Sequence, residues 1–470
     1  MSRLSKALVC SLLLLCASTG LRAQGTGDPL VDPYRDAANR LIGAAMADSA
    51  AWQRLALLTD TFGNRLSGSE ALERAIDWVL AQMKSDGLDR PVKEPVMVPH
   101  WVRGTESAEL VSPRRVNLPM LGLGGSVATP RAGITAPVLV VSSFDELTAR
   151  AAEAKGKIVL FDAPFTSYGQ TVRYRVGGAS AAAKVGAVAA LIRSVASYSI
   201  RSPHTGVMIY DTTVSPRKIP IAALSVEDAM MLHRMADRGD RVVVKLMMSA
   251  RTLPDAQSHN VMAEITGSEH PEEVVVLGGH IDSWDVGTGA MDDAGGVVAA
   301  WEAVRLMKQL GLRPRRTVRV VGWTNEENGG KGGEGYRDAR GKDGVANHVL
   351  AIESDGGVFK PIGFGFTGTD SAMAIVRRVA TLLAPIGSDS ISNRGGGADI
   401  APLMQRGVAG MGLATDGERY FWFHHSPGDM VDKLDPDDVA RCVATMAVMA
   451  YVIADLPERL PLGPPSQGDE

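Results

Sequence analysis

From Asn260 onward, the chain alternates short apolar runs with segments of helical periodicity. Val274–Leu277 and Val318–Trp323 are typical of buried strands, and Val297 and Trp301 mark one face of a helix between them. Strands that alternate with helices of this length predict a sheet that helices cover on both faces. The fold class that we expect is therefore α/β, with three layers and a mostly parallel central sheet.

A smaller block with its own alternation of strands and helices precedes this region. Residues 126–252 are rich in Gly, Ala and Val, with strand-like runs such as Val138–Val141 and Ile158–Phe161. The block has no cluster of titratable side chains, and we expect His204 and His233 to be structural. We interpret it as an inserted smaller α/β domain. The expected organisation is a signal peptide at 1–23, the N-terminal part of the main domain at 24–125, the insert at 126–252, the main domain at 253–457 and a disordered tail at 458–470.

The first 23 residues have the pattern of a secretory signal peptide. Arg3 and Lys6 precede a largely apolar run of eleven residues, 7–17, and Ala23 is a small residue suited to cleavage before Gln24. The run is too short to span a bilayer, and no other segment reaches about 18 consecutive apolar residues. We therefore expect a secreted or periplasmic protein with no membrane span.

Charge and cysteine content argue against a nucleic-acid-binding protein and against a disulfide-stabilised one. The 49 basic and 53 acidic residues give a net charge of −4, and a mildly acidic chain without a basic stripe is not expected to bind nucleic acid. Cys10 and Cys16 lie in the signal segment, so only Cys442 remains after cleavage. We expect no internal disulfide, and stability from core packing or a bound metal.

A helix start is also predicted near the beginning of the main domain. Ser67-Gly68-Ser69-Glu70 fits a capping box, and Leu72 and Ile76 follow on one helical face. Gly87 is a suitable stop for this helix.

Metal-ligating side chains follow the predicted strands of residues 260–450, at the points where those strands end. Any one such pair is most often a solvated turn, a helix cap or a surface acidic pair. Because ligands in such sheets bind beyond the carboxyl ends of strands, the coincidence of all the pairs at one edge predicts a metal site. Without cations, burial of so many carboxylates would cost several kcal/mol each. The pairs are His280 with Asp282, Asp292 with Asp293, Glu326 with Glu327, Glu353 with Asp355, and His424 with His425.

The ligand types indicate the metal. Two imidazoles and three carboxylates without thiolates suit Zn²⁺, with Co²⁺ or Mn²⁺ as substitutes. Five ligands exceed what one tetrahedral catalytic zinc takes, but they divide well between two ions that share a bridging carboxylate. One further carboxylate is then needed as a general base, and the Glu326-Glu327 pair supplies it.

Five short motifs carry a resemblance to a known family. The chain resembles the dizinc aminopeptidase family, which includes secreted bacterial aminopeptidases and the glutamate carboxypeptidases. The resemblance covers nearly the whole mature chain, and it implies a zinc-peptidase fold, a protease-associated-like insert, a homodimer and short peptides or dipeptides as substrates. The motifs are Gly-His-Ile-Asp-Ser-Trp-Asp at 279–285, Met-Asp-Asp at 291–293, Thr-Asn-Glu-Glu at 324–327, Glu-Ser-Asp at 353–355 and His-His-Ser-Pro-Gly-Asp at 424–429.

The resemblance also implies roles for individual residues. Asp292 would bridge two zinc ions, Glu326 would be the general base, and Asp282 would orient the imidazole of His280. His424 is an alternative to His425 as a ligand. At the position of His424 the family often has Tyr. The implied metal ligands are His280, Asp292, Glu327, Asp355 and His425, with Glu353 as an alternative to Asp355.

The function that we expect is hydrolysis of dipeptides, or release of single terminal residues from short peptides, by an exported dizinc metallopeptidase. The alternatives are an aminopeptidase of the same family, a single-zinc glutaminyl cyclase-like acyltransferase, and a non-catalytic receptor-like relative. The sequence does not indicate which peptide end is recognised. Arg394 is a candidate for binding a carboxylate, and a solvated loop arginine is the alternative. The insert is expected to roof the cleft.

Overall fold

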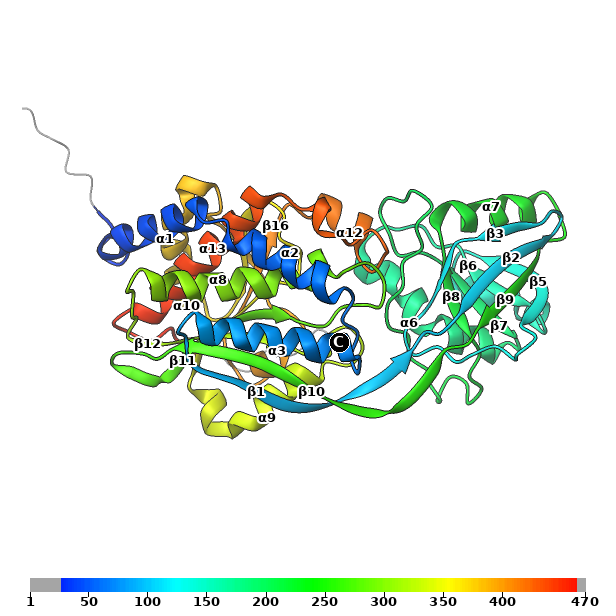
Figure 1. Ribbon diagram of the computed structural model, residues 1–470. Helices are drawn as coiled ribbons and strands as arrows, with labels where there is room; N and C mark the ends of the chain where they lie inside the picture. The colour runs from blue at the N-terminus through cyan, green and yellow to red at the C-terminus, as the bar shows by residue number, and fades with distance from the viewer. Residues whose placement is uncertain (1–26, 463–470) are drawn as a thin grey trace, which may run out of the picture.

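The computed structural model describes residues 27–462, which form two α/β lobes joined by a long two-stranded ribbon (Figure 1). The expected signal peptide and residues 463–470 lie outside the described residues. Among the described residues, no helix has both the length and the apolar character needed to cross a membrane. Cys442 is a free, buried thiol.

The larger lobe contains an eight-stranded sheet in the order β1-β10-β12-β11-β13-β16-β14-β15. The central strands β12, β11, β13 and β16 are parallel, while β10 and β14 pair antiparallel to this group. The strands are β1 (Asp89–Val102), β10 (Arg251–Ile265), β11 (His270–His280), β12 (Arg316–Trp323), β13 (His348–Glu353), β14 (Pro361–Thr367), β15 (Ser390–Asn393) and β16 (Gly410–Thr415).

Helices cover both faces of this sheet, which confirms the predicted α/β fold. Val275 and Leu277 of β11 belong to one apolar cluster, whereas Val274 and Val276 belong to the cluster on the opposite face, as strand periodicity requires. Trp301 of α8 is fully buried on the first face. The first face is covered by α1 (Arg35–Ala47), α2 (Ala50–Phe62), α3 (Glu70–Ser85), α8 (Gly295–Gln309), α10 (Asp370–Ala380) and α13 (Pro436–Asp455), and the second by α9 (Lys331–Ala346) and α11 (Ala401–Met404).

The second lobe has its own eight-stranded sheet, in the order β3-β2-β9-β5-β6-β7-β8-β4. Helices α4 (Phe144–Ala149), α6 (Tyr168–Lys184) and α7 (Val226–Asp237) accompany it. The strands are β2 (Glu106–Ser112), β3 (Val116–Leu118), β4 (Met120–Gly122), β5 (Ile134–Val141), β6 (Ile158–Phe161), β7 (Ala189–Arg193), β8 (Ile221–Leu224) and β9 (Val243–Met248).

The boundary expected at residue 126 differs from the observed topology. Strands β2, β3 and β4 precede residue 126, yet β2 pairs with β9 and β4 pairs with β8 inside the second sheet. The composition of β2 hides this membership, because the polar residues Ser107 and Glu109 alternate with the buried Ala108 and Leu110. The chain enters the second lobe after β1 and leaves it through β10, and these two strands pair from Asp89–Glu264 to Val102–Arg251.

The start of the expected disordered tail also differs from the prediction. Leu460 is buried in the main core, and Arg459 donates hydrogen bonds to the carbonyl oxygens of Ala346 and His348, at 2.6 and 2.9 Å. These contacts hold Arg459 and Leu460 against the larger lobe.

Candidate metal centre

The predicted ligands come together at one edge of the larger sheet. His280 is the last residue of β11, the pair Glu326-Glu327 follows β12, and Asp355 follows β13. Asp292 lies in a short irregular turn, Ala290–Ala294, which directly precedes α8. His425 follows β16 and the short helix α12 (Tyr420–Phe423). Parallel strands end at a common edge, so residues distant in sequence become neighbours here.

The two carboxylate oxygens of Asp292 face two different imidazoles. Oδ1 of Asp292 lies 3.1 Å from Nε2 of His280, and Oδ2 lies 3.3 Å from Nε2 of His425. Asp355 Oδ1 is 3.3 Å from the same nitrogen of His280, and Glu327 Oε2 is 3.0 Å from that of His425. Two imidazole–carboxylate pairs therefore share Asp292, each through one of its oxygens.

The chemistry of this donor set fits a pair of divalent cations. Asp292 is 4% exposed, and the imidazole nearest to its Oδ2 is that of His425, at 3.3 Å. Burial acts to raise the pKa of Asp292, but the neighbouring imidazoles of His280 and His425 outweigh it and hold the pKa well below the usual range. Burial, together with the charge of Asp292, raises the pKa of Glu327 well above its usual range. Buried carboxylates gathered in this way need cations, and nitrogen with oxygen ligands suits zinc.

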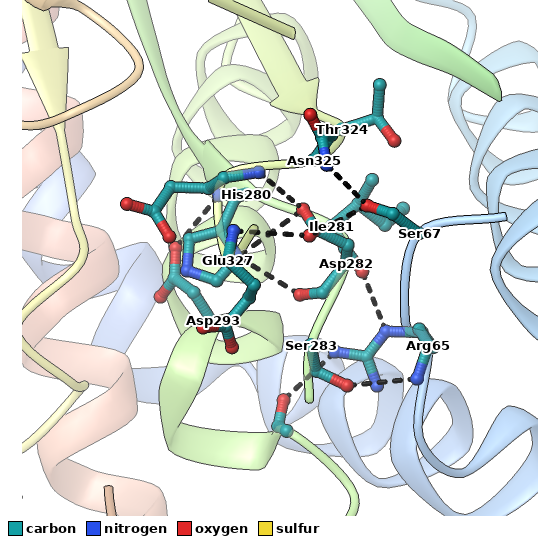
Figure 2. A network of polar contacts seen from close by, with 12 residues as sticks. Arg65, Ser67, His280, Ile281, Asp282, Ser283, Asp293, Thr324, Asn325 and Glu327 are labelled. Atoms are coloured by element: carbon teal, nitrogen blue, oxygen red, sulfur yellow. Dashed lines mark hydrogen bonds and ion pairs between the residues drawn. The ribbon is translucent and has the colours of Figure 1, made fainter. Parts of the chain in front are cut away.

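A second set of contacts holds the imidazole of His280 (Figure 2). Its Nδ1 lies 3.0 Å from the carbonyl oxygen of Asp282. A carbonyl only accepts, so Nδ1 carries a proton, and Nε2 is the nitrogen left to bind a metal ion. The carboxylate of Asp282 is farther away, with Oδ1 at 3.7 Å from Nδ1. The sequence-based role of orienting His280 is thus performed mainly by the main chain of Asp282.

The carboxylate of Asp282 instead contacts the loop that carries both glutamates. Its Oδ1 accepts the main-chain N–H of Glu326 at 3.1 Å, and its Oδ2 accepts that of Glu327 at 3.4 Å. Ser67 Oγ donates to the same Oδ2 at 3.4 Å and accepts from Asn325 Nδ2 at 3.0 Å. Asp282 therefore links the end of β11 to the loop after β12.

Ser67 does not cap α3 as the capping-box pattern predicts. The N-cap is Ser69, whose side chain accepts the N–H of Leu72 at 3.2 Å. Gly68 adopts φ +82° and turns the chain there. Ser67 is consequently free to join the polar network around Asp282.

Arg65 is a buried support of this site that the sequence analysis missed. Its guanidinium donates to the carbonyl oxygens of Ile281 (2.8 Å), Thr288 (2.6 Å) and Gly289 (3.0 Å). Burial lowers its pKa to about 10. These bonds fasten the end of β11 to the turn before Asp292. Because the partners lie more than two hundred positions away in sequence, no local pattern could have revealed them.

Glu326 is half-buried and lines a cavity of about 330 Å³ between the two lobes. Burial and the charge of Asp355 raise the pKa of Glu326 well above its usual range. The larger lobe lines the cavity with Asp292, Glu326, Glu327, Asp355, Tyr420, Phe421, His424 and His425, and the second lobe with Tyr168, Arg175 and Val207.

The alternative ligands that the sequence left open differ in their contacts. His424 stacks on His425 with ring centroids 3.5 Å apart, but its Nε2 lies 3.7 Å from Asp292, farther than that of His425. Glu353 is buried, and its Oε2 accepts the N–H of Ile400 at 2.9 Å. Burial raises its pKa to about 8. The geometry favours His425 and Asp355 as ligands.

Residues of the second lobe hold the histidine loop. The N–H of Thr205 donates to the carbonyl oxygen of His425 at 2.9 Å, and Nδ1 of His204 lies 2.6 Å from the carbonyl oxygen of His424. Burial lowers the pKa of His204 to about 4. His233 lies within the second lobe, 2.7 Å from the carboxylate of Asp162. Both histidines have structural contacts.

Comparisons with known proteins show which proteins this chain is similar to. Residues 260–450 match the model of peptidase family M28. The chain is 52% identical to carboxypeptidase Q of Xenopus laevis over 434 residues, which cover 92% of each chain. A peptidase M28 precursor from Shewanella amazonensis has a crystal structure with TM-score 0.89 and 37% identity, covering 92% of this chain and 99% of that one. A zinc aminopeptidase from Bacillus subtilis shares the fold, with TM-score 0.63 and 20% identity over 87% and 98% of the two chains.

The fold, the ligand clusters and these matches define a zinc metallopeptidase. The chain belongs to peptidase family M28, among its carboxypeptidase Q-like members. The resemblance seen in the sequence motifs is thereby confirmed.

Proposed function

We propose that this protein is an exported dizinc exopeptidase that cleaves dipeptides or releases single terminal residues from short peptides. The observation that carries the proposal is the position of Asp292 between two imidazole–carboxylate pairs. His280 and Asp355 would hold one ion, and Glu327 and His425 the other, with Asp292 shared. A single-zinc acyltransferase would not need both pairs, and a non-catalytic relative would need neither.

The residues of the site would have different roles in peptide hydrolysis. Zinc bound at the two pairs would supply a Lewis acid and lower the pKa of an attacking water. The carboxylate of Glu326 accepts the proton of that water and returns it to the nitrogen of the leaving amine. Burial and the charge of Asp355 raise the pKa of Glu326 above its usual range, which favours proton uptake by this carboxylate. Asp282 positions Glu326 through the main-chain N–H.

The size and lining of the cavity support the proposal that the substrates are short peptides. Its volume of about 330 Å³ is enclosed by walls from both lobes, among them Tyr168 and Val207 of the second lobe. A space of this size suits a dipeptide better than a folded protein chain. The residues that the second lobe contributes to the cavity wall support the role of a roof that we expect for the insert. Residues 1–23 support export, and the family resemblance supports a homodimer.

Two isosteric substitutions test the proposal. Glu326→Gln removes the base and leaves the ligands, so zinc content is expected to stay at two per chain while kcat falls about 10²–10⁴-fold. Glu327→Gln replaces a ligand oxygen, so zinc content is expected to fall. Elemental analysis and single-substrate kinetics measure both effects. Equal zinc content and equal rates in the two variants would contradict the assignment, and one zinc per fully active chain would exclude a bridging Asp292.

A further inference from the structure

Two polar side chains of α6 extend from the second lobe into the cavity wall. Tyr168 and Arg175 are seven residues apart, which is two helical turns, and both line the cavity that contains Asp292 and Glu326. Nη2 of Arg175 donates to the phenol oxygen of Tyr168 at 2.7 Å. The pair therefore forms one unit that faces the proposed reaction site.

Arg175 is a buried cation without a carboxylate partner. It is 4% exposed, and no ion pair among residues 27–462 includes it. Its remaining contacts are the carbonyl oxygen of Thr205, 3.5 Å from Nη1, and Nδ1 of His425, 3.3 Å from the same nitrogen, while Nε has no acceptor. A buried charge without a counter-ion is costly, so this position calls for an anion.

The surrounding backbone is shaped for this guanidinium. A Cβ at Gly206 would lie 2.4 Å from Nη1 of Arg175, and Gly206 adopts φ +133°, which side chains rarely tolerate. Gly206 thus leaves the space that Arg175 occupies. If Nε2 of His425 binds a metal, its Nδ1 carries the proton. Nη1 of Arg175 then loses that acceptor and is available to a ligand.

Tyr168 adds a second donor at the same place. Its oxygen accepts from Arg175, and within the described residues its own O–H has no acceptor. The carboxylates on the cavity wall include the three proposed zinc ligands, whose charge the metal offsets. Arg175 then supplies the positive charge of the cavity wall, next to the free hydroxyl of Tyr168. Adjacent charged and neutral donors of this kind suit a carboxylate.

We propose that Arg175, with Tyr168, binds the free α-carboxylate of the substrate and makes the enzyme selective for peptides with an unblocked C-terminus. The inference rests on the proposed function and assigns the side chains that recognise the C-terminal end of the peptide. Arg394, the candidate from the sequence, is exposed on a loop and does not line the cavity.

The test compares Ala-Phe with Ala-Phe-amide. The wild-type enzyme is expected to cleave the free acid with a kcat/KM about 100-fold higher than the amide, the size of effect typical of a buried charge pair. Arg175→Met should bring this ratio close to one by raising KM for the acid, with zinc content unchanged. Arg175→Lys keeps the charge and should keep part of the selectivity.

Arg173→Met is the matched control. Arg173 lies on the same helix, is exposed, and packs over the rings of Phe144 and Tyr174 away from the cavity. This variant should keep the wild-type ratio. A wild-type enzyme that cleaves acid and amide equally would overturn the inference while the peptidase function stands. Equal loss on both substrates in Arg175→Met, together with lost zinc, would overturn it by showing that Arg175 only holds His425.

A binding experiment separates this inference from the proposed function. Phenylalanine and phenylalaninamide are titrated calorimetrically into the wild-type protein and Arg175→Met. Phenylalanine should bind the variant at least about tenfold more weakly than the wild type, and phenylalaninamide should show no such difference. If neither peptide is cleaved, the proposed function fails, but this titration still decides the carboxylate site. Equal binding of phenylalanine to both proteins would refute it.

Discussion

Asp282→Asn tests whether the loop after β12 is positioned by one carboxylate. The substitution keeps the shape of the side chain but turns one oxygen into an NH₂ donor. Oδ1 faces the N–H of Glu326 at 3.1 Å, and Oδ2 faces that of Glu327 at 3.4 Å. In either orientation of the new amide, its NH₂ meets a main-chain N–H, and one of these hydrogen bonds is lost.

The structure sets the magnitude of this loss. A hydrogen bond to a charged acceptor contributes about 1.5–3 kcal/mol, and here the donor would also stay buried. Groups that support metal ligands in this way typically change metal affinity about 10–100-fold when removed, and this range corresponds to about 1.4–2.7 kcal/mol. The two estimates agree, so we expect zinc affinity to fall about 10–100-fold in Asp282→Asn.

The assay is competition for zinc with a chelator of known affinity, and Asp285→Asn is its control. Asp285 lies three positions further along and pairs with Arg103 at 2.6 and 2.9 Å, but it does not contact the glutamate loop. The control should keep zinc affinity within about threefold of the wild type. Wild-type affinity in Asp282→Asn, or an equal decrease in both variants, would refute the reasoning.

Three further predictions concern stability and substrate size. Burial lowers the pKa of His348 to about 4 in the folded protein. The same imidazole in the unfolded chain binds a proton near pH 6.5, so protonation favours unfolding. The free energy of unfolding should therefore fall by up to about 3 kcal/mol as the pH drops from 6.5 to 4. Urea unfolding at several pH values should show a smaller fall in His348→Gln, and exposed His270→Gln should match the wild type. Trp301 is fully buried and donates to Asp86 at 2.9 Å; Trp301→Ala should lower the free energy of unfolding by about 3–5 kcal/mol, whereas Leu57→Ala on the surface should change it by less than about 0.5 kcal/mol. Hydrolysis rates for peptides of increasing length should decrease from dipeptides onward, and a flat or rising profile would show an open cleft.

Much of the secondary structure could be predicted because its signals are local. Buried strands are continuous apolar runs, and Ile158–Phe161 is β6 with the predicted bounds. The strand-like run Val138–Val141 lies within β5, Ile134–Val141. The wrong predictions also arose from local sequence signals. The polar alternation of β2 concealed its sheet, and Ser67 matched a capping pattern although its hydroxyl is used elsewhere.

The sequence by itself determined which side chains stand at the ends of the central strands, because strand periodicity and residue type are both readable along the chain. His280, Glu327 and Asp355 follow from that pattern. Only the tertiary structure decided that the two oxygens of Asp292 face different imidazoles, and that Arg175 is buried beside His425, 250 positions away in sequence. A buried arginine and an exposed one look alike in a sequence. Their difference lies in desolvation and in distant partners, which exist only once the chain has folded.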